Sequence, residues 1–158
     1  MAKRKSAYID TTIPSYYFEE RKEFRVYREI TRRWWDTEKK HYDVYISEVS
    51  MAELEYGEYP HKNEIISLVK GIPLLEVTQE IEDIANVYMI DHLMPKEDFG
   101  DAFHTALASF YKIDYFLAWN CVHLANEHKQ EHLRVINTRL GLFIPRITTP
   151  MMLLGEEV

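Results

Sequence analysis

Residues 98–120, with the sequence DFGDAFHTALASFYKIDYFLAWN, place the strongest constraint on the fold of this chain. The segment predicts a helix that begins near Asp98, a tight turn, and an apolar strand over residues 114–119. A strand this apolar is typical of the centre of a parallel sheet, where both of its faces are covered. Carboxylates at the start of the helix and polar side chains after the strand would then lie at the edge where parallel sheets place their chemistry.

Strands alternate with helices along the rest of the chain. The expected strands cover residues 6–10, 42–46, 73–77, 114–119 and 146–148. The main expected helices cover about 13–20, 22–39, a segment from Ser47 or Ser50 to Tyr56, 62–70, 78–93, 98–112 and 122–140. This alternation predicts an α/β fold with a parallel sheet covered by helices. Because the sequence shows neither an internal repeat nor a linker, we expect a single domain over residues 1–158.

Composition excludes several functional classes. The formal net charge of −7 argues against a protein that coats nucleic acid by bulk charge, although it leaves a nuclease with clustered carboxylates possible. A single cysteine fits a reducing compartment, and no segment approaches the roughly 20 apolar residues of a membrane span, so we expect a cytoplasmic protein without a membrane partner. Glycine-rich phosphate loops and nucleophile elbows are missing from the sequence.

Acidic residues fall at the ends of several predicted elements. Asp10 ends the first strand, and Glu53 borders an apolar stripe that Val49, Ala52 and Tyr56 would form on one helix. A carboxylate beside an apolar stripe needs a partner or a metal ion. Asp98 and Asp101 both lie at the start of the helix in residues 98–112, and periodicity does not choose between them, since either could simply favour the positive end of the helix dipole.

These acids converge if the first and fourth strands are neighbours in the sheet, because the carboxyl ends of parallel strands meet at one edge. Asn120 follows the fourth strand and would join Asp10, Glu53 and Asp101 there. Oxygen ligands of this kind suit the hard cations Mg²⁺ or Mn²⁺.

The helix expected over residues 22–39 is unusually basic. Arg25, Arg28 and Arg32 share one face and are interleaved with aromatic side chains, a combination that suits contact with RNA phosphates and stacking on bases. The alternative is a solvated face with ion pairs inside the helix, whose aromatic residues face the core or a partner subunit.

Three segments of the chain resemble the signature blocks of the PIN domain family: YIDTTIPSYY, ISEVSMAELEYG and DAFHTALASFYKIDYFLAWNCVHLAN. That family includes the ribonuclease toxins of VapC-type toxin–antitoxin pairs. The resemblance covers nearly the whole chain in order. It implies a three-layer α/β/α sandwich with a central parallel sheet of four to five strands, and cleavage of RNA that depends on Mg²⁺ or Mn²⁺.

The resemblance also assigns roles to individual residues. It makes Asp10, Glu53 and Asp101 the first three catalytic acids and metal ligands, with Thr11 or Thr12 as the hydroxyl beside the first. Asn120 and His123 stand where many members have a fourth acid, and an amide there can orient water without adding negative charge. Asp98 is an additional candidate ligand.

Function and partners follow from the same resemblance. It implies an endoribonuclease that acts on RNA, a homodimer and, for a toxin, an antitoxin protein that covers the site. The weak fourth position supports an alternative, a PIN-like RNA-binding or scaffold module that has little or no catalytic activity. A nuclease that acts on DNA is a further alternative.

Overall fold

A five-stranded parallel sheet forms the centre of the computed structural model, which describes residues 4–91, 99–119 and 127–155. The strands are β1 (Ser6–Ile9), β2 (Asp43–Ser47), β3 (Leu74–Leu75), β4 (Tyr115–Leu117) and β5 (Arg146–Thr148). Their order is β3-β2-β1-β4-β5, and every neighbouring pair is parallel. The predicted α/β fold with a parallel sheet is therefore confirmed.

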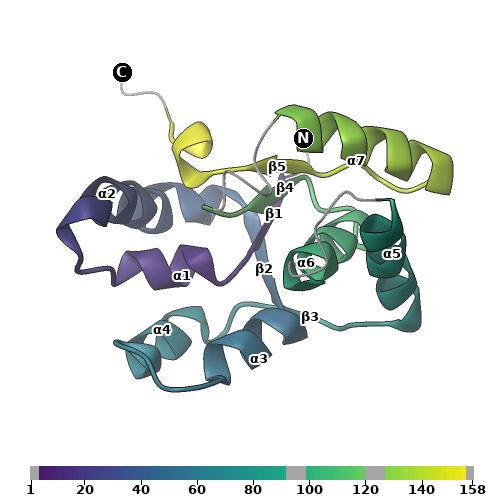
Figure 1. Cartoon of the computed structure of the whole chain (residues 1–158). Coiled ribbons are helices and arrows are strands. Elements are labelled where there is room, and N and C mark those ends of the chain that lie inside the picture. Colours follow the sequence, from purple (N-terminus) through teal and green to yellow (C-terminus); the bar gives the residue numbers. More distant parts are fainter. Residues whose placement is uncertain (1–3, 92–98, 120–126, 156–158) are drawn as a thin grey trace.

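Helices cover both faces of this sheet (Figure 1). They are α1 (Thr12–Tyr17), α2 (Arg25–Arg33), α3 (Glu48–Glu55), α4 (Lys62–Val69), α5 (Gln79–Ile90), α6 (Phe99–Phe110) and α7 (Glu127–Leu140), with a 3-10 turn at Pro150–Leu153. One apolar cluster joins the strands to α5, α6 and α7, and a second joins them to α1, α2 and α4. The two clusters on opposite faces make the three-layer α/β/α sandwich that was predicted.

Side chains alternate between the two clusters along each strand, as the pleat of a strand requires. In β1, Tyr8 enters the cluster on the α5–α6 side, whereas Ala7 and Ile9 enter the other. In β4, Phe116 and Leu117 divide in the same way. Both strands are thus buried on both faces, which places the β1–β4 pair at the centre of the molecule.

Local capping explains where two of the helices begin. The hydroxyl of Ser47 accepts a hydrogen bond from the backbone N–H of Ser50 and caps α3, and Thr78 caps α5 through the N–H of Ile81. After α3 and α4, Gly57 and Gly71 adopt positive φ angles of 71° and 90°, which stop each helix at little steric cost.

The basic segment 22–39 is less regular than the single predicted helix. It comprises a 3-10 turn at Lys22–Phe24, α2, a π-helical stretch at Trp34–Glu38 and a 3-10 turn at Lys39–His41. Trp34 is fully buried in the core, while Trp35 remains half-exposed against the ring of Tyr17. A π-helical turn contains more residues than an α-helical turn, so the side chains after it point in a different direction. The segment thus departs from α-helical geometry where Trp34 enters the core.

The order of the strands reverses between β1 and β4. Ile9 pairs with Leu117 in the parallel register, and the N–H of Asp10 donates to the carbonyl of Leu117 at 3.2 Å. At the other end of the pair, the carboxylate of Asp114 accepts from the N–H of Ser6 at 2.9 Å. The pair is thus fixed at both ends, and its carboxyl end is the switch point where an open α/β sheet forms a site. Among the described helices, none has both the length and the apolar composition needed to cross a membrane.

Candidate active site

Asp10 follows β1 directly and lies at the switch point. Its side chain is only 4% exposed. One oxygen, Oδ1, accepts two hydrogen bonds from Thr12, from the backbone N–H at 2.9 Å and from the hydroxyl at 2.5 Å. The same hydroxyl accepts from the N–H of Trp119 at 2.9 Å, so it connects the loop after β1 to the end of β4. Of the two threonines considered from the sequence, Thr12 is the one that contacts Asp10, whereas Thr11 is the N-cap residue of α1 and makes no side-chain capping bond.

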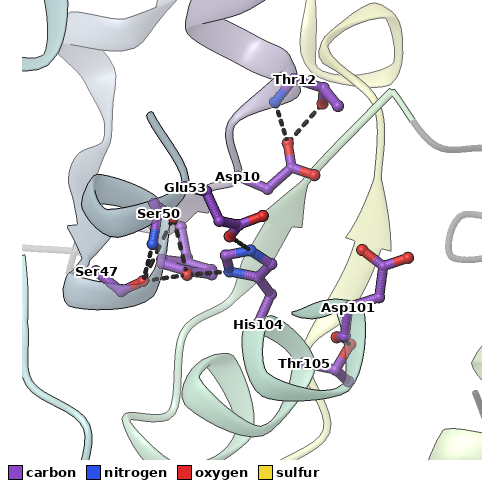
Figure 2. Close-up of polar contacts among 9 residues, drawn as sticks. Asp10, Thr12, Ser47, Ser50, Glu53, Asp101, His104 and Thr105 are labelled. Atoms are coloured by element: carbon purple, nitrogen blue, oxygen red, sulfur yellow. Dashed lines mark hydrogen bonds and ion pairs between the residues drawn. The ribbon is translucent and has the colours of Figure 1, made fainter. Parts of the chain in front are cut away.

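Glu53 reaches the switch point from α3. Its side chain is 42% exposed, and Oε1 accepts a hydrogen bond from Nε2 of His104 at 2.6 Å (Figure 2). The prediction of a buried apolar stripe beside Glu53 is wrong, because Ala52 and Tyr56 are exposed. The buried residues of α3 are Ser50 and Leu54. The helix therefore turns the face of Ser50 and Leu54 to the core, and not the predicted stripe.

Asp101 approaches from the first turn of α6 and is half-exposed. Its backbone carbonyl accepts from the hydroxyl of Thr105 at 2.9 Å. Its charge raises the pKa of both Asp10 and His104, so its carboxylate lies within electrostatic range of the other two side chains. Figure 2 shows Asp10, Glu53 and Asp101 arranged about His104.

His104 is a site residue that the sequence reasoning missed. It is 2% exposed, with Nδ1 lying 2.5 Å from the hydroxyl of Tyr8 and Nε2 bonded to Glu53. The Tyr8 hydroxyl also lies 2.6 Å from the hydroxyl of Ser47. A signal was present in the sequence: His104 lies among small apolar residues on the buried side of α6, and a buried polar group requires a partner.

Burial and charge shape the protonation of the site. Burial raises the pKa of Asp10 from 3.8 to about 6, although His104 and the hydrogen bonds from Thr12 act in the opposite direction. Burial alone would lower the pKa of His104, but the hydrogen bond to Glu53 and the charges of nearby acids raise it above its ordinary value. Burial raises the pKa of Tyr8, which therefore stays neutral. The acids around His104 thus stabilise the protonated form of its ring.

The carboxylate oxygens of the site are the kind of donor that Mg²⁺ prefers. Among the described residues, no hydrogen bond engages Oδ2 of Asp10 or Oε2 of Glu53, whose other oxygens bond to Thr12 and His104. Over residues 4–91, 99–119 and 127–155, no three acidic, histidine or cysteine side chains are already spaced to hold a single ion. Mg²⁺ is commonly bound through one or two carboxylates with several retained waters, so this arrangement suits it better than a cation that needs a complete protein cage.

Three of the predicted site residues, Asp98, Asn120 and His123, lie outside the described residues. Their roles remain predictions. Asp10, which follows β1, Glu53 on α3 and Asp101 on α6 are brought to the same end of the sheet.

The arginines of α2 differ in their surroundings. Arg28 donates to the carbonyl of Glu19 and pairs with Glu29 at 3.0 Å, and Nε of Arg32 donates to the carbonyl of Tyr17 at 2.7 Å. Arg25 is exposed and makes no hydrogen bond or ion pair with any other described residue. Two of the three predicted RNA-binding arginines therefore brace the α1–α2 connection, and Arg25 is the most accessible to a ligand.

Comparison with known proteins identifies the fold. The VapC20 toxin of Mycobacterium tuberculosis, which cleaves the sarcin–ricin loop, is similar with a TM-score of 0.59 and 14% identity, over 75% of this chain and 92% of the toxin chain. VapBC2 from Rickettsia felis, bound to a DNA fragment of its promoter, is similar with a TM-score of 0.55 and 12% identity, over 90% of this chain and 97% of the matched chain.

These likenesses confirm the predicted PIN-like fold, the fold of VapC toxins. No protein-family model matches the sequence, and comparison with curated proteins finds no match. At 12–14% identity, the solved structures establish the shared fold alone.

Proposed function

We propose that this chain is a divalent-metal-dependent endoribonuclease and the toxin of a toxin–antitoxin pair. The observation that carries the proposal is the meeting of Asp10, Glu53 and Asp101, from three separate elements, at the β1–β4 switch point. Phosphodiester cleavage develops negative charge on the phosphoryl group, and a bound divalent cation stabilises that charge. Carboxylates gathered at this position on a VapC-like fold would bind such a cation.

Asp10, Glu53 and Asp101 would hold Mg²⁺ or Mn²⁺, with Asp98 as an additional ligand. The bound ion would supply a more acidic water and neutralise charge on the phosphoryl group. Thr12 holds Oδ1 of Asp10, and Oδ2, which bonds to no residue within the described part of the chain, would face the ion. A cation beside Asp10 would favour its ionised form against the effect of burial.

Other residues would orient the substrate and the attacking water. The amide of Asn120 and the ring of His123, directly after β4, are proposed to position water close to the scissile phosphate. Arg25 is proposed to contact the RNA backbone, and Arg28 and Arg32 to contribute positive charge while bracing α2.

Partners are proposed from the solved structures. VapC20 cleaves the sarcin–ricin loop, which supports RNA as the substrate, and VapBC2 is a complex, which supports an antitoxin partner for this chain. We also propose a homodimer. A search of the neighbouring reading frame for a small antitoxin would test the toxin assignment directly.

A second candidate function is an RNA-binding or scaffold module that has lost catalysis. The observation that favours it is Asn120, which brings no negative charge to the position of the fourth acid. This candidate predicts RNA binding without cleavage.

The decisive experiment combines calorimetric titration of Mn²⁺ with an assay of RNA cleavage. We expect the wild type to bind Mn²⁺ and cleave RNA, and Asp10→Asn to lose both while keeping the size of the side chain. Glu82→Gln is the matched control, because it removes one exposed acid on α5. Cleavage that persists in Asp10→Asn contradicts the nuclease site, and RNA binding without cleavage in the wild type supports the second candidate. Parallel assays with DNA, tRNA and single-stranded RNA separate the substrates.

A further inference from the structure

The carboxylate of Glu53 depends on one contact for its position. Glu53 lies on the exposed side of α3, and within the described residues its only side-chain hydrogen bond comes from Nε2 of His104 at 2.6 Å. Glutamate is among the side chains with the most rotamer freedom to lose. Without this contact, its carboxylate would sample solvent instead of facing Asp10.

His104 is itself held from two directions. Its ring is buried between Tyr8 and Phe116, with centroid distances of 5.6 Å and 6.1 Å. The Tyr8 hydroxyl lies 2.5 Å from Nδ1 and also contacts the hydroxyls of Ser47 and Ser50 at the start of α3. A chain of polar contacts thus runs from the start of α3 through Tyr8 and His104 back to Glu53 on the same helix. Figure 2 shows Ser47, Ser50, His104 and Glu53 along this chain.

The polarity of this chain is fixed at one end. An ionised carboxylate only accepts hydrogen bonds, so Nε2 of His104 must be the donor to Glu53. Nε2 is the donor to Glu53 in both states of the ring. In the neutral ring Nδ1 accepts from Tyr8, and in the charged ring both nitrogens donate. Because Nε2 carries a proton directed at Glu53, it is not available as a metal ligand. The other oxygen of Glu53, Oε2, lies 3.8 Å from the position of a β-carbon on Gly100 and faces the first turn of α6.

We propose that His104, held by Tyr8, is a positioning residue that fixes Glu53 with Oε2 directed to the divalent cation. The inference rests on the proposed function, since it concerns the affinity of that same site. Hydrogen bonds to metal-binding carboxylates orient the ligands, and their removal typically costs about 10–100-fold in metal affinity.

Calorimetric titration of Mn²⁺ tests the proposal without reference to activity. We expect His104→Ala to bind Mn²⁺ about 10–100-fold more weakly than the wild type. His104→Gln, whose amide nitrogen can replace Nε2 as the donor, should recover most of this loss. Tyr8→Phe should give an intermediate affinity, because the ring of His104 stays but loses its anchor at Nδ1.

A matched control is available at another histidine–glutamate pair. His61 contacts Glu64 at 2.5 Å on the surface between α3 and α4, with a positive φ of 64° that asparagine also tolerates. His61→Asn should therefore leave Mn²⁺ affinity unchanged. Unchanged affinity in His104→Ala would overturn the proposal. A His104→Gln protein that folds but binds as weakly as His104→Ala would also overturn it, because ring packing would then be the cause.

A second measurement separates this proposal from the proposed function. In the metal-free protein, ¹⁵N NMR of the histidine rings should show a protonated Nε2 in His104, assigned by its absence in His104→Gln, and a changed signal in Glu53→Gln. An unprotonated Nε2 overturns the positioning role even if Mn²⁺ binds. If the wild type shows the protonated Nε2 but binds no Mn²⁺, the hydrogen bond from His104 to Glu53 exists without a cation site. That result overturns both the cation site and the proposal that His104 positions Glu53 for it.

Discussion

Asp10 and Thr12 are joined by two hydrogen bonds to a single carboxylate oxygen, one from the backbone N–H and one from the side-chain hydroxyl. The hydroxyl then accepts from the N–H of Trp119, so a single side chain connects the ends of β1 and β4. The position of the first acid is thus set by the strand pair itself.

The Thr12 hydroxyl gives a first prediction. Thr12→Ala removes a hydrogen bond to Asp10 and leaves the Trp119 N–H without its partner, so it should lower the free energy of unfolding by about 1–3 kcal/mol. Thr12→Ser keeps the hydroxyl and should lose much less. Urea unfolding of the two variants measures the difference, and equal losses would show that the methyl group matters instead.

Asp10 gives a prediction for the dependence of stability on pH. Its pKa of about 6 in the folded protein lies above its ordinary value of 3.8, so its ionisation opposes folding, and stability is gained as pH falls through 6 towards 4. The difference corresponds to about 3 kcal/mol. In metal-free buffer at neutral pH, Asp10→Asn should therefore be more stable than the wild type by up to about 3 kcal/mol.

The same comparison with added Mn²⁺ is the control for this effect. Ligand at about 100 times its dissociation constant stabilises a protein by about 2.7 kcal/mol, and only the wild type should gain this stability. Guanidinium unfolding at pH 4, pH 6 and pH 7.5 gives the sign of the change in the free energy of unfolding with pH. A wild type that loses stability between pH 6 and pH 4 by as much as Asp10→Asn would contradict the prediction.

Arg25 gives a prediction for RNA binding. In an Asp10→Asn background that blocks cleavage, Arg25→Ala should weaken binding of single-stranded RNA. If Arg25 neutralises one phosphate, the slope of log binding constant against log salt concentration should become shallower by about 0.7. Folding stability should not change, because Arg25 is exposed and unpaired with the described residues. Fluorescence anisotropy at several salt concentrations gives the slope. Arg139→Ala, which removes an exposed charge on α7, should leave this slope unchanged.

Asn137 gives a prediction for the core. It is fully buried, accepts from the Tyr88 hydroxyl at 2.7 Å and donates to the Phe143 carbonyl at 2.8 Å. Asn137→Ala removes both hydrogen bonds, leaves the Tyr88 hydroxyl with Ser109 as its remaining partner and creates a small cavity, so it should cost about 2–4 kcal/mol. The neighbouring Thr138→Ala, on the exposed side of α7, should change stability by less than about 0.5 kcal/mol. Thermal unfolding distinguishes them.

Strong local signals made the fold predictable from the sequence. The apolar run that became β4 was typical of a central strand, and Ser47 and Thr78 began their helices as helix caps do. The third strand was predicted over residues 73–77 but contains only Leu74 and Leu75, because an edge strand has one neighbour to define its length.

The candidate site was less accessible to sequence reasoning. Glu53 was singled out from periodicity through a stripe on α3 that does not face the core, so that reason was wrong. The resemblance to the PIN family selected Glu53 independently. His104 was missed because its partners come from other elements, with Tyr8 lying 96 positions away and Glu53 lying 51 positions away. Periodicity within one helix carries no information on contacts at such separations.

The pairing of β1 with β4 also governs when the site comes into being during synthesis of the protein. Ser6 and Asp114 are 108 positions apart, and Ile9 meets Leu117. A nascent chain therefore carries Asp10 and Glu53 long before the strand that orders the switch point has left the ribosome. Contacts this distant in sequence form late and slowly. The site is thus incomplete until translation has passed β4, and a chain that stalls earlier contains Asp10 and Glu53 without the strand that pairs with the end of β1.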